Sequence, residues 1–356
     1  MNILLASTSP IKVNAIKRVF PDATITTVDC ADCKLPEQPL DCGDFCARAR
    51  LVYAKANTQT ESEYIISIEN SIDTAPGMGQ ADRCHVLIEH KGLFGYSAGC
   101  VAYPVDPRIM AKALLETIDP ANPFAPAAGT RRIRGLTPTI GQLYHNLDSS
   151  IDPKNWVKTI HKSDRVDQIC ASITAAWMDL QAKLAIAQKL ISCYKTYSDY
   201  PKTGVVFEDF FAVIRERNSL QDLMKLLVSQ CRLDDFDYVC GPESRGFFGF
   251  GLSCAGGYGF MPIRKAGKLP GECHTISYEK EYGSDTLELQ ADVPAGARVL
   301  VFDDLIASGG SAKAACDLLE KAGCEIVNVV VLREVRHLRA TAMQTLGIPY
   351  TVLLQD

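Results

Sequence analysis

The sequence lacks the features of a membrane protein or a nucleic-acid-binding protein. Its 356 residues contain no apolar stretch long enough to span a bilayer. The formal net charge of -5 gives no positive excess for a nucleic-acid surface. Met1–Leu5 begins directly with an apolar run typical of a strand, so we expect no signal peptide. These absences lead us to expect partners that are neither membranes nor nucleic acids.

Two further absences concern domain organisation and nucleotide binding. No flexible linker precedes Pro201, and a helical pattern from Val166 to about Tyr197 bridges the two halves. Because 356 residues are many for one domain, we expect two rigidly coupled domains, residues 1–185 and 186–356. A Walker A loop is missing, since no Gly-Lys-Ser/Thr occurs at the required spacing after a glycine. A phosphate site in this chain must therefore be of another kind.

Cysteine is abundant, with 14 residues, but they are scattered over segments that resemble core strands and helices. A secreted disulfide scaffold would be short and rich in loops, so we expect free thiols in a reducing, cytoplasmic compartment. One group, Cys30, Cys33, Cys42 and Cys46, has spacings that also suit a zinc site. The sequence leaves both explanations of this group open.

The strongest local signal lies in residues 298–319. A short apolar run, Val299–Phe302, has the length and β-branched character of a buried strand, and the acidic pair Asp303 and Asp304 follows it. A turn of small residues over 307–311 then leads into an expected helix. Backbone N–H groups at such a helix start bind phosphate, and glycines let it approach closely. The paired carboxylates suit ribose hydroxyls, a metal ion or both.

A second strand-to-helix turn stands near the beginning of the chain. The apolar run Ile3–Ala6 is followed by polar residues 7–12, with proline in the first turn of an expected helix. Another buried strand, Tyr64–Ile68, ends at Glu69. A phosphate-binding turn beside a carboxylate at a strand end is the arrangement expected for a metal-assisted phosphate site.

Four stretches of the first half together resemble the inosine/xanthosine triphosphatase family. They are Ser7–Lys12, Pro36–Pro39, Ser67–Ile72 and Asp164–Ile169. The resemblance covers about residues 1–185. It implies hydrolysis of inosine or xanthosine triphosphate (ITP or XTP) to the monophosphate and pyrophosphate, with Mg²⁺ or Mn²⁺. The sequence departs from the family pattern at Ser9, where Asn is usual, and at Ser71, where Gly is usual.

The same resemblance implies roles for individual residues. Glu69 would ligate the metal and orient the attacking water, which makes it both a catalytic and a metal-binding candidate. The residues implied to bind the nucleotide are Ser7, Thr8, Ser9 and Lys12 at the triphosphate, and Arg165 and Gln168 near the purine. A lysine and a metal ion suit this task because they neutralise the charge that develops on phosphate. The alternative is a regulatory nucleotide-binding module that has lost catalysis through Ser9 and Ser71.

The second half resembles the type I phosphoribosyltransferases, and among them the adenine phosphoribosyltransferase family, over about Tyr197–Asp356. Five stretches carry the resemblance: Tyr200–Phe207, Gly241–Phe247, Ile263–Gly271, Ser277–Gly283 and Asp303–Ser311. It implies a Rossmann-like parallel sheet with a mobile hood over Lys268–Thr286. It also implies transfer of the 5-phosphoribosyl group from 5-phosphoribosyl-1-pyrophosphate (PRPP) to adenine, which yields AMP and pyrophosphate and requires Mg²⁺.

The motifs of this second resemblance imply a set of site residues. Those implied to bind PRPP are Arg245, Arg264, Lys265, Lys268, Asp303, Asp304, Ala307, Ser308, Gly309, Gly310 and Ser311. Those implied to bind the purine are Val206, Phe207 and Glu208, of which Phe207 offers a flat ring for stacking. Glu281 matches the acid/base residue at the purine. The family often has Arg at the position of Glu208, which leaves hypoxanthine or guanine open as the base.

Taken together, the sequence predicts an α/β protein of two domains, a nucleoside-triphosphatase-like domain followed by a type I phosphoribosyltransferase domain. The expected partners are small molecules, namely adenine, PRPP and ITP or XTP. The two resemblances also imply a homodimer or a larger homo-oligomer. A regulator that binds PRPP without chemistry is disfavoured, because the hood residues Lys268 and Glu281 are both present.

Overall fold

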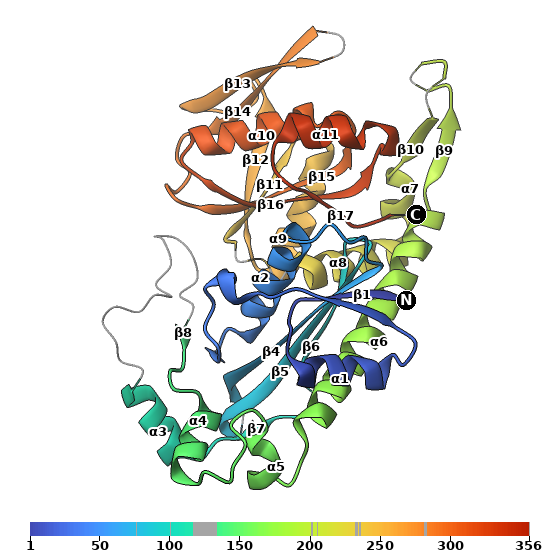
Figure 1. The fold of residues 1–356 in the computed structure, drawn as a ribbon. Helices are drawn as coiled ribbons and strands as arrows, with labels where there is room; N and C mark the ends of the chain where they lie inside the picture. The colour runs from blue at the N-terminus through green and yellow to red at the C-terminus, as the bar shows by residue number, and fades with distance from the viewer. Residues whose placement is uncertain are drawn as a thin grey trace. The chain divides into compact units, whose positions relative to one another are not determined.

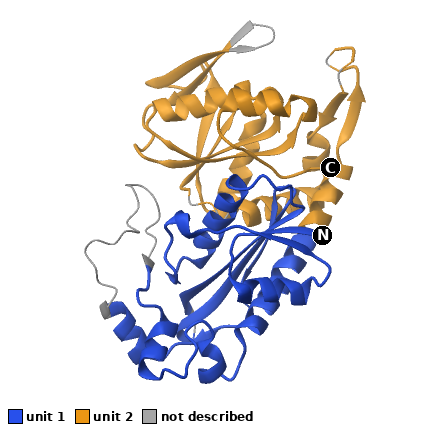
Figure 2. Cartoon of the chain, viewed as in Figure 1, with its two compact units in different colours: residues 1–182 blue, residues 183–356 orange. Residues whose placement is uncertain are grey.

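The computed structural model describes residues 1–75, 77–99, 101–116, 134–200, 202–204, 206–231, 234, 236–280 and 283–355. The chain forms two compact units, Met1–Ala182 and Lys183–Asp356 (Figures 1 and 2). The division falls within the long helix α6 (Arg165–Ser192). Within the described ranges, no helix has both the length and the apolar character needed to cross a membrane.

The first unit is built on a mixed sheet. In the described residues it has eight strands: β1 (Asn2–Leu5), β2 (Thr24–Thr27), β3 (Pro39–Leu40), β4 (Tyr64–Ala75), β5 (Gly79–His90), β6 (Leu93–Ala98), β7 (Tyr103–Pro104) and β8 (Arg134–Gly135). Strand β1 runs parallel to β2 on one side and to β4 on the other. Strand β5 pairs antiparallel with β4, β6 and β7, so the sheet continues away from β1 as a long hairpin.

Six helices belong wholly or partly to the first unit in the described residues. They are α1 (Pro10–Val19), α2 (Gly43–Ala56), α3 (Pro107–Glu116), α4 (Ile140–Leu147), α5 (Trp156–Ile160) and the first part of α6. Helix α1 begins at proline, whose missing N–H is not needed there, and its last turn carries Lys17 and Arg18 beside the negative end of the helix dipole. The turn between β1 and α1 therefore presents a helix start directly beside the parallel strand β4.

Three expected elements differ from the structure. The strand expected to end before Glu69 continues as β4 to Ala75, because the residues after it pair with β5. The helix expected to reach Tyr197 ends at Ser192, and β9 (Lys195–Ser198) follows. The strand expected over Val299–Phe302 continues through both acids as β15 (Arg298–Ile306), because its later residues pair with β16 (Glu325–Glu334).

The second unit has a seven-stranded sheet in the described residues, with the order β13-β14-β12-β11-β15-β16-β17. Its bounds are β11 (Tyr238–Pro242), β12 (Gly259–Lys265), β13 (Cys273–Lys280), β14 (Gly283–Gln290), β15 (Arg298–Ile306), β16 (Glu325–Glu334) and β17 (Thr351–Val352). The five strands from β12 to β17 in this order are parallel, whereas β13 and β14 form an antiparallel hairpin at one edge. A separate ribbon joins β9 to β10 (Val206–Asp209).

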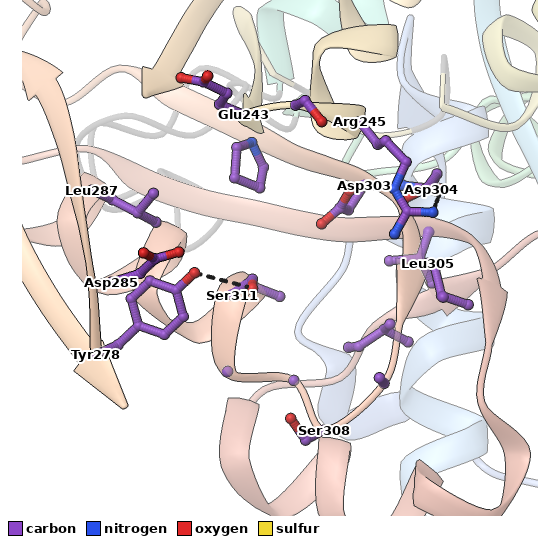
Figure 3. A pocket seen from close by; sticks show the side chains of 18 of the residues that line it. Glu243, Arg245, Tyr278, Asp285, Leu287, Asp303, Asp304, Leu305, Ser308 and Ser311 are labelled. Atoms are coloured by element: carbon purple, nitrogen blue, oxygen red, sulfur yellow. Dashed lines mark hydrogen bonds and ion pairs between the residues drawn. The ribbon is translucent and has the colours of Figure 1, made fainter. Parts of the chain in front are cut away.

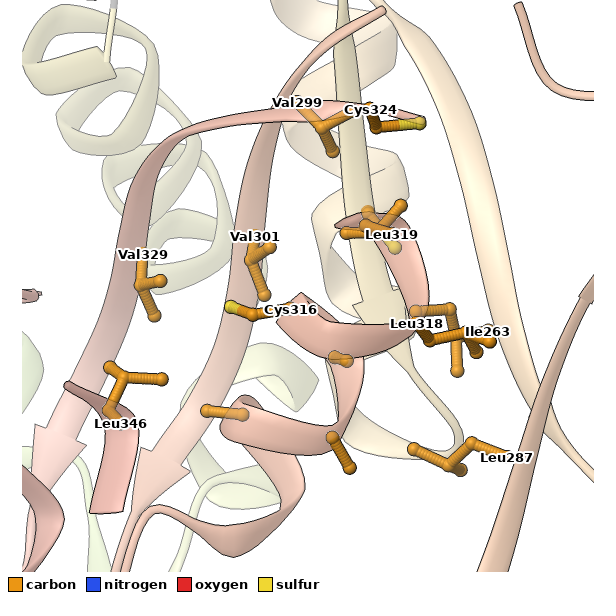
Figure 4. Packing of buried hydrophobic residues seen from close by; sticks show 14 of the residues in the cluster. Ile263, Leu287, Val299, Val301, Cys316, Leu318, Leu319, Cys324, Val329 and Leu346 are labelled. Atoms are coloured by element: carbon orange, nitrogen blue, oxygen red, sulfur yellow. The ribbon is translucent and has the colours of Figure 1, made fainter. Parts of the chain in front are cut away.

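Alternation along β15 explains how helices cover both faces of this sheet. Val299 and Val301 belong to the buried cluster that includes Leu318 and Leu319 of α10 (Gly310–Lys321), as Figure 4 shows. Phe302 points to the opposite face, where α9 (Gly249–Gly256) approaches so closely that a Cβ at Gly249 would lie 3.2 Å from the Phe302 Cβ. The remaining helices are α7 (Phe211–Arg215), α8 (Arg217–Cys231) and α11 (Arg339–Leu346). The strand that carries the acidic pair is thus held rigidly from both sides.

Candidate active sites

The turn expected to bind phosphate in the second unit, residues 307–311 (the phosphate-binding turn), joins a strand to a helix, as its sequence predicts. Asp303 and Asp304 lie near the carboxyl end of β15, and α10 begins at Gly310. Gly309 has a φ of +86°, and a Cβ there would lie 3.0 Å from the carbonyl oxygen of Ala342. Only glycine fits this position without strain. The turn therefore places backbone N–H groups at the start of a twelve-residue helix, where an anion is favoured.

A cavity of about 480 Å³ lies above this turn. Figure 3 shows the acidic pair on one wall, the phosphate-binding turn below and the hairpin residues Tyr278 and Asp285 opposite. Arg245, just after β11, forms an ion pair with Asp304 at 2.9 Å. Residues from four separate segments therefore bring carboxylates, backbone N–H groups and cationic side chains to one space.

The carboxylates of the acidic pair are electrostatically costly in the free protein. Burial raises the pKa of Asp303 well above its ordinary value, and the adjacent Asp304 carboxylate adds to the effect. Burial also raises the pKa of Asp304, although the Arg245 guanidinium opposes this shift. A bound cation or ribose hydroxyl would relieve that cost, which is typical of residues shaped for a ligand rather than for stability.

The β13–β14 hairpin brings further groups to the cavity. Tyr278 of β13 lies with its hydroxyl 3.3 Å from the Ser311 hydroxyl in the phosphate-binding turn (Figure 3). Lys265 also lines the cavity, with its ammonium 3.9 Å from Asp285. Glu281, the expected acid/base residue, lies outside the described residues. The hairpin therefore contacts the phosphate-binding turn through the hydroxyl groups of Tyr278 and Ser311.

Two of the expected PRPP-binding cations are not among the described lining residues. Arg264 instead forms an ion pair with Glu243 at 3.0 Å. Lys268 is held by its backbone, whose N–H donates to a carboxylate oxygen of Glu288 at 2.6 Å. The same Glu288 carboxylate accepts two further backbone N–H groups, which lowers its pKa through those hydrogen bonds. This carboxylate ties down the loop that carries Lys268.

The three expected purine-binding residues lie on β10. Phe207 has its ring centre 6.0 Å from the Arg245 guanidinium and 5.2 Å from the Tyr200 ring. Val206 is exposed. Glu208 does not present a free carboxylate, because it accepts two hydrogen bonds from the guanidinium of Arg333, at 2.7 and 2.9 Å. The negative charge that left the choice of base open is therefore neutralised within the protein.

Comparison with known proteins defines the class of the second unit. Residues 264–342 match the family model of the phosphoribosyl transferase domain, so this part of the chain is a phosphoribosyltransferase domain. The chain is 43% identical to adenine phosphoribosyltransferase of Candida albicans over 157 residues, 44% of this chain and 84% of that protein. It is 44% identical to the Trichodesmium erythraeum protein of the same name over 142 residues, 39% of this chain and 84% of that protein.

A solved structure of adenine phosphoribosyltransferase from Saccharomyces cerevisiae shows 41% identity and a TM-score of 0.45, and covers 48% of this chain and 99% of that one. The two sequence relatives are each matched over 84% of their length at 43% and 44% identity. The C-terminal part of the chain therefore belongs to the adenine phosphoribosyltransferase family.

The first unit has a cavity of its own, of about 540 Å³. The expected triphosphate-binding residues Ser7, Thr8, Ser9 and Lys12 line it, together with Glu69 and Arg165. Lys12, in the first turn of α1, donates a hydrogen bond of 2.5 Å to the carbonyl oxygen of Ile68. The structure thus brings the N-terminal turn, the β4 carboxylate and the start of α6 to one space.

Glu69 is neither at a strand end nor free in this structure. It lies within β4, only 3% exposed, and forms an ion pair with Arg50 of α2. In the described residues, no group of three or more His, Cys, Asp or Glu side chains is arranged to hold a metal ion. A cation at Glu69 would therefore take part of its coordination from phosphate oxygens or water, an arrangement that Mg²⁺ commonly adopts.

The polar groups at the far end of this cavity form a buried network. Arg165 forks onto the Asp82 carboxylate with hydrogen bonds of 2.5 and 3.0 Å. Gln168 is 1% exposed, and its side-chain oxygen accepts hydrogen bonds from Arg165 at 2.8 Å and from Asn70 at 3.3 Å. Gln168 is not among the described lining residues, so here it positions Arg165 and Asn70 rather than facing the cavity.

The two departures from the triphosphatase pattern have different surroundings. Ser9 lines the cavity at the turn before α1. Ser71 is fully buried, and its hydroxyl lies 2.9 Å from His85 and 2.5 Å from Asp73. A Cβ at Gly43 would lie 2.4 Å from the Ser71 hydroxyl oxygen, so the glycine at the start of α2 makes room for this serine. Ser71 is therefore accommodated by its neighbours and is not among the described lining residues.

The cysteine group separates into two pairs. Cys30 and Cys33 lie at the short turn Ala31–Cys33, whereas Cys42 and Cys46 lie at the start of α2. All four are free thiols. Burial raises the pKa of Cys30 to about 12, so this thiol stays protonated at neutral pH.

Several functional neighbours were absent from the sequence prediction. In the second unit they are Glu243, Tyr278, Asp285 and Arg333, and in the first unit Arg50, Asn70 and Asp82. Tyr278 and Glu243 stand inside stretches that carry the family resemblance, so position alone could have flagged them. The partners Arg50, Asp82 and Arg333 leave no local signal, because each is defined by a contact with a residue far away in the chain.

Proposed function

We propose that the second unit transfers the 5-phosphoribosyl group of PRPP to adenine and releases AMP and pyrophosphate. The observation that carries this proposal is the convergence of the acidic pair, the phosphate-binding turn and Arg245 on one cavity. Family membership at more than 40% identity supports adenine as the base. The engagement of Glu208 by Arg333 removes the feature that favoured another purine.

Each wall of the cavity suits one part of PRPP. Backbone N–H groups of the turn 307–311 bind the 5-phosphate, and the carboxylates of Asp303 and Asp304 accept hydrogen bonds from the ribose hydroxyls. Arg245 and Lys265 supply positive charge for the departing pyrophosphate. The hairpin closes over the substrates and excludes water, which otherwise competes with the base for an oxocarbenium-like ribose. Glu281 is the proposed acid/base group at the purine.

The donor set also fits magnesium. Asp303 and Asp304 are adjacent buried carboxylates with raised pKa values, and a divalent cation would stabilise their ionised forms. In the described residues, no group of three or more His, Cys, Asp or Glu side chains is arranged to hold a metal by itself, so PRPP or water would complete the coordination. When bound, Mg²⁺ supplies charge neutralisation for pyrophosphate. Asp303 and Asp304 are the residues that would hold it or the hydroxyls it touches.

The test is a direct assay of the purified full-length chain. Adenine, hypoxanthine and guanine are supplied separately with PRPP and Mg²⁺, and the products are separated by chromatography. We expect AMP and pyrophosphate from adenine, with the other two bases used at least about 10²-fold less efficiently in kcat/KM. Preferred formation of IMP or GMP would overturn the choice of base, and no nucleotide from any base would overturn the transferase assignment.

We further propose that the first unit hydrolyses ITP or XTP to the monophosphate and pyrophosphate. The support is its separate cavity, which gathers a helix start, Lys12, a buried carboxylate and a forked arginine. Lys12 and the N–H groups before α1 suit the triphosphate, and Glu69 suits a cation or the attacking water. Both activities would act on purine nucleotides, one making AMP and the other removing non-standard triphosphates.

The assay for this unit supplies ITP, XTP and ATP separately with Mg²⁺ and resolves the products. Monophosphate and pyrophosphate from ITP and XTP, with little from ATP, is the expected result. The alternative of a regulatory module predicts no hydrolysis and instead a change in AMP synthesis when these nucleotides are added. Absence of both effects would leave the first unit without a nucleotide function.

A further inference from the structure

The ribbon that carries the proposed purine-binding residues needs an anchor. Strand β10 pairs only with β9 among the described strands, and a two-stranded ribbon is marginally stable alone. Its residues alternate between two faces, so Phe207 and Glu208 point in opposite directions. On the first face, the Phe207 ring lies near Arg245. The contact on the second face decides how firmly the ribbon is oriented.

On that second face, Glu208 meets a single buried arginine. Arg333, at the carboxyl end of β16, donates from two nitrogens to the two carboxylate oxygens at 2.7 and 2.9 Å. A third nitrogen of the same guanidinium donates to the carbonyl oxygen of Leu354 at 2.8 Å. The side chain of Arg333 is 10% exposed and that of Glu208 is 31% exposed, so the guanidinium is shielded from water whereas the carboxylate is partly open to it. A bidentate ion pair fixes both distance and orientation, which a single-point contact does not.

The guanidinium is supported from behind. It lies 5.7 Å from the centre of the Tyr194 ring, which in turn packs 6.3 Å from the ring of Phe210. Phe210 is 2% exposed and directly follows β10. Apolar burial at Phe210 and the charged fork at Glu208 thus hold the same short strand at adjacent places.

We propose that Arg333 is a positioning and specificity-determining residue of the purine site, acting through its bidentate bond to Glu208. The fork orients β10 so that Phe207 faces the base, and it keeps the Glu208 carboxylate away from the base. The purine is then read by the Phe207 ring and the backbone of β10, not by the charge of Glu208. This inference rests on the proposed transfer to a purine, and it adds a residue outside every motif of the sequence analysis.

Loss of the Arg333–Glu208 fork should change the KM for adenine much more than the KM for PRPP. Arg333→Leu releases the Glu208 carboxylate and the orientation of β10, while the acidic pair and the phosphate-binding turn stay in place. We expect the KM for adenine to rise about tenfold or more, because Glu208 loses both hydrogen bonds that fix the orientation of β10, with the KM for PRPP changed less than about twofold. Arg333→Lys should behave like Arg333→Leu, because an ammonium cannot form the fork.

The exchange Glu208→Arg with Arg333→Glu provides the rescue. It restores an ion pair of reversed direction, so the adenine KM should return at least halfway, on a logarithmic scale, towards the wild-type value. The matched control is Arg298→Leu, which removes another arginine fork. Arg298 donates to the Asp237 carboxylate at 2.7 and 3.1 Å, and it lies at the first residue of β15, away from the carboxyl ends of the strands where Arg333 lies. A general loss of stability would affect both variants alike and both substrates alike.

The outcomes are distinct. An adenine KM that rises alone in Arg333→Leu and is restored by the exchange supports the inference. An unchanged adenine KM, or equal increases for adenine and PRPP, overturns it. Failure of the wild-type chain to form AMP overturns the proposed function instead. Circular dichroism of each variant establishes that the comparison is made between folded proteins. If Arg333→Leu is unfolded, the same kinetic comparison is made with Glu208→Gln, which changes the more exposed partner of the pair.

Discussion

The guanidinium of Arg245 lies 2.9 Å from the Asp304 carboxylate and 6.0 Å from the centre of the Phe207 ring. One side chain thus touches the group proposed for the ribose and the group proposed for the purine. Arg245→Gln removes this charge and leaves Asp304, which is 4% exposed, without its cation. We expect kcat/KM for PRPP to fall about 10²-fold, roughly 2.7 kcal/mol, in a steady-state assay of AMP formation.

Arg298→Gln is the control for this variant, because its ion pair with Asp237 lies at the other end of the strand. Its kcat/KM should stay within about twofold of wild type, as is usual for a partly exposed pair. Equal activity of Arg245→Gln and wild type would contradict the assignment of Arg245 to the PRPP site.

Substitution of Gly309 should affect both the stability of the protein and its KM for PRPP. Gly309→Ala adds a Cβ at a φ of +86°, 3.0 Å from the Ala342 carbonyl oxygen. The left-handed backbone alone costs an alanine about 1–2 kcal/mol. Because the turn must shift as well, we expect the KM for PRPP to rise about tenfold or more. Thermal unfolding and initial rates measure the two effects.

Gly323→Ala isolates the first effect. Gly323 has a similar φ of +80°, but a Cβ there would have nothing within 4 Å. This variant should lose stability without a change in the KM for PRPP. If Gly309→Ala also retains the wild-type KM, the turn does not bind phosphate through its backbone.

The sequence predicts those parts of the site that are local in the chain. The run Val299–Phe302, two acids and a glycine turn indicate strand, loop and helix through short-range chemistry. The structure has β15 and α10 here, although β15 continues through both acids to Ile306 because it pairs with β16. Helix α1 likewise begins at Pro10 and ends at Val19, as its first-turn proline and basic last turn indicate.

Long-range pairing accounts for what the sequence did not show. The extension of β4 through Glu69 to Ala75 depends on β5 as a partner, and the acid that appeared to end a strand is instead buried against Arg50. The helix expected to reach Tyr197 stops at Ser192, because residues 195–198 pair with β10. The fork between Glu208 and Arg333 joins residues 125 positions apart, and no periodicity in either segment encodes it.

We expect the ionised acidic pair to lower the free energy of unfolding of the substrate-free protein, although the same carboxylates serve ligand binding. The folded-state pKa of Asp303 is raised above its value of 3.8 in the unfolded chain. A carboxyl group whose pKa is raised in the folded state stabilises the fold most at pH values below its pKa in the unfolded chain. This contribution is lost as the pH rises through its pKa in the folded state. Asp303→Asn, which does not ionise, should therefore be more stable than wild type at neutral pH.

We expect the gain to be on the order of 1 kcal/mol, about 2–4 °C in Tm, and to disappear near pH 4. AMP synthesis should be lost in the same variant, because an amide replaces the carboxylate proposed to hold a ribose hydroxyl. Differential scanning fluorimetry from pH 4 to 8, without substrates, measures the first effect. A stability difference that is constant across this range would contradict the raised pKa.

Glu69 offers the sharpest test of the first unit, because its chemistry can be removed while its shape is kept. Glu69→Gln retains an oxygen that accepts from Arg50 but loses the charge that a cation or an attacking water would use. We expect hydrolysis of ITP and XTP to fall about 10²–10³-fold. AMP synthesis should stay within about twofold, since Glu69 belongs to the other compact unit.

Glu89→Gln is the matched control, because Glu89 of β5 also pairs with a cation of α2, Lys55, yet is not among the described lining residues of the cavity. Loss of hydrolysis in Glu69→Gln alone assigns the chemistry to the carboxylate. Equal loss in both variants indicates that the ion pairs between α2 and the sheet act through stability. Undiminished hydrolysis in Glu69→Gln would remove this carboxylate from the proposed mechanism, and Asp82, which lines the same cavity but is held by Arg165, would be the next acid to replace.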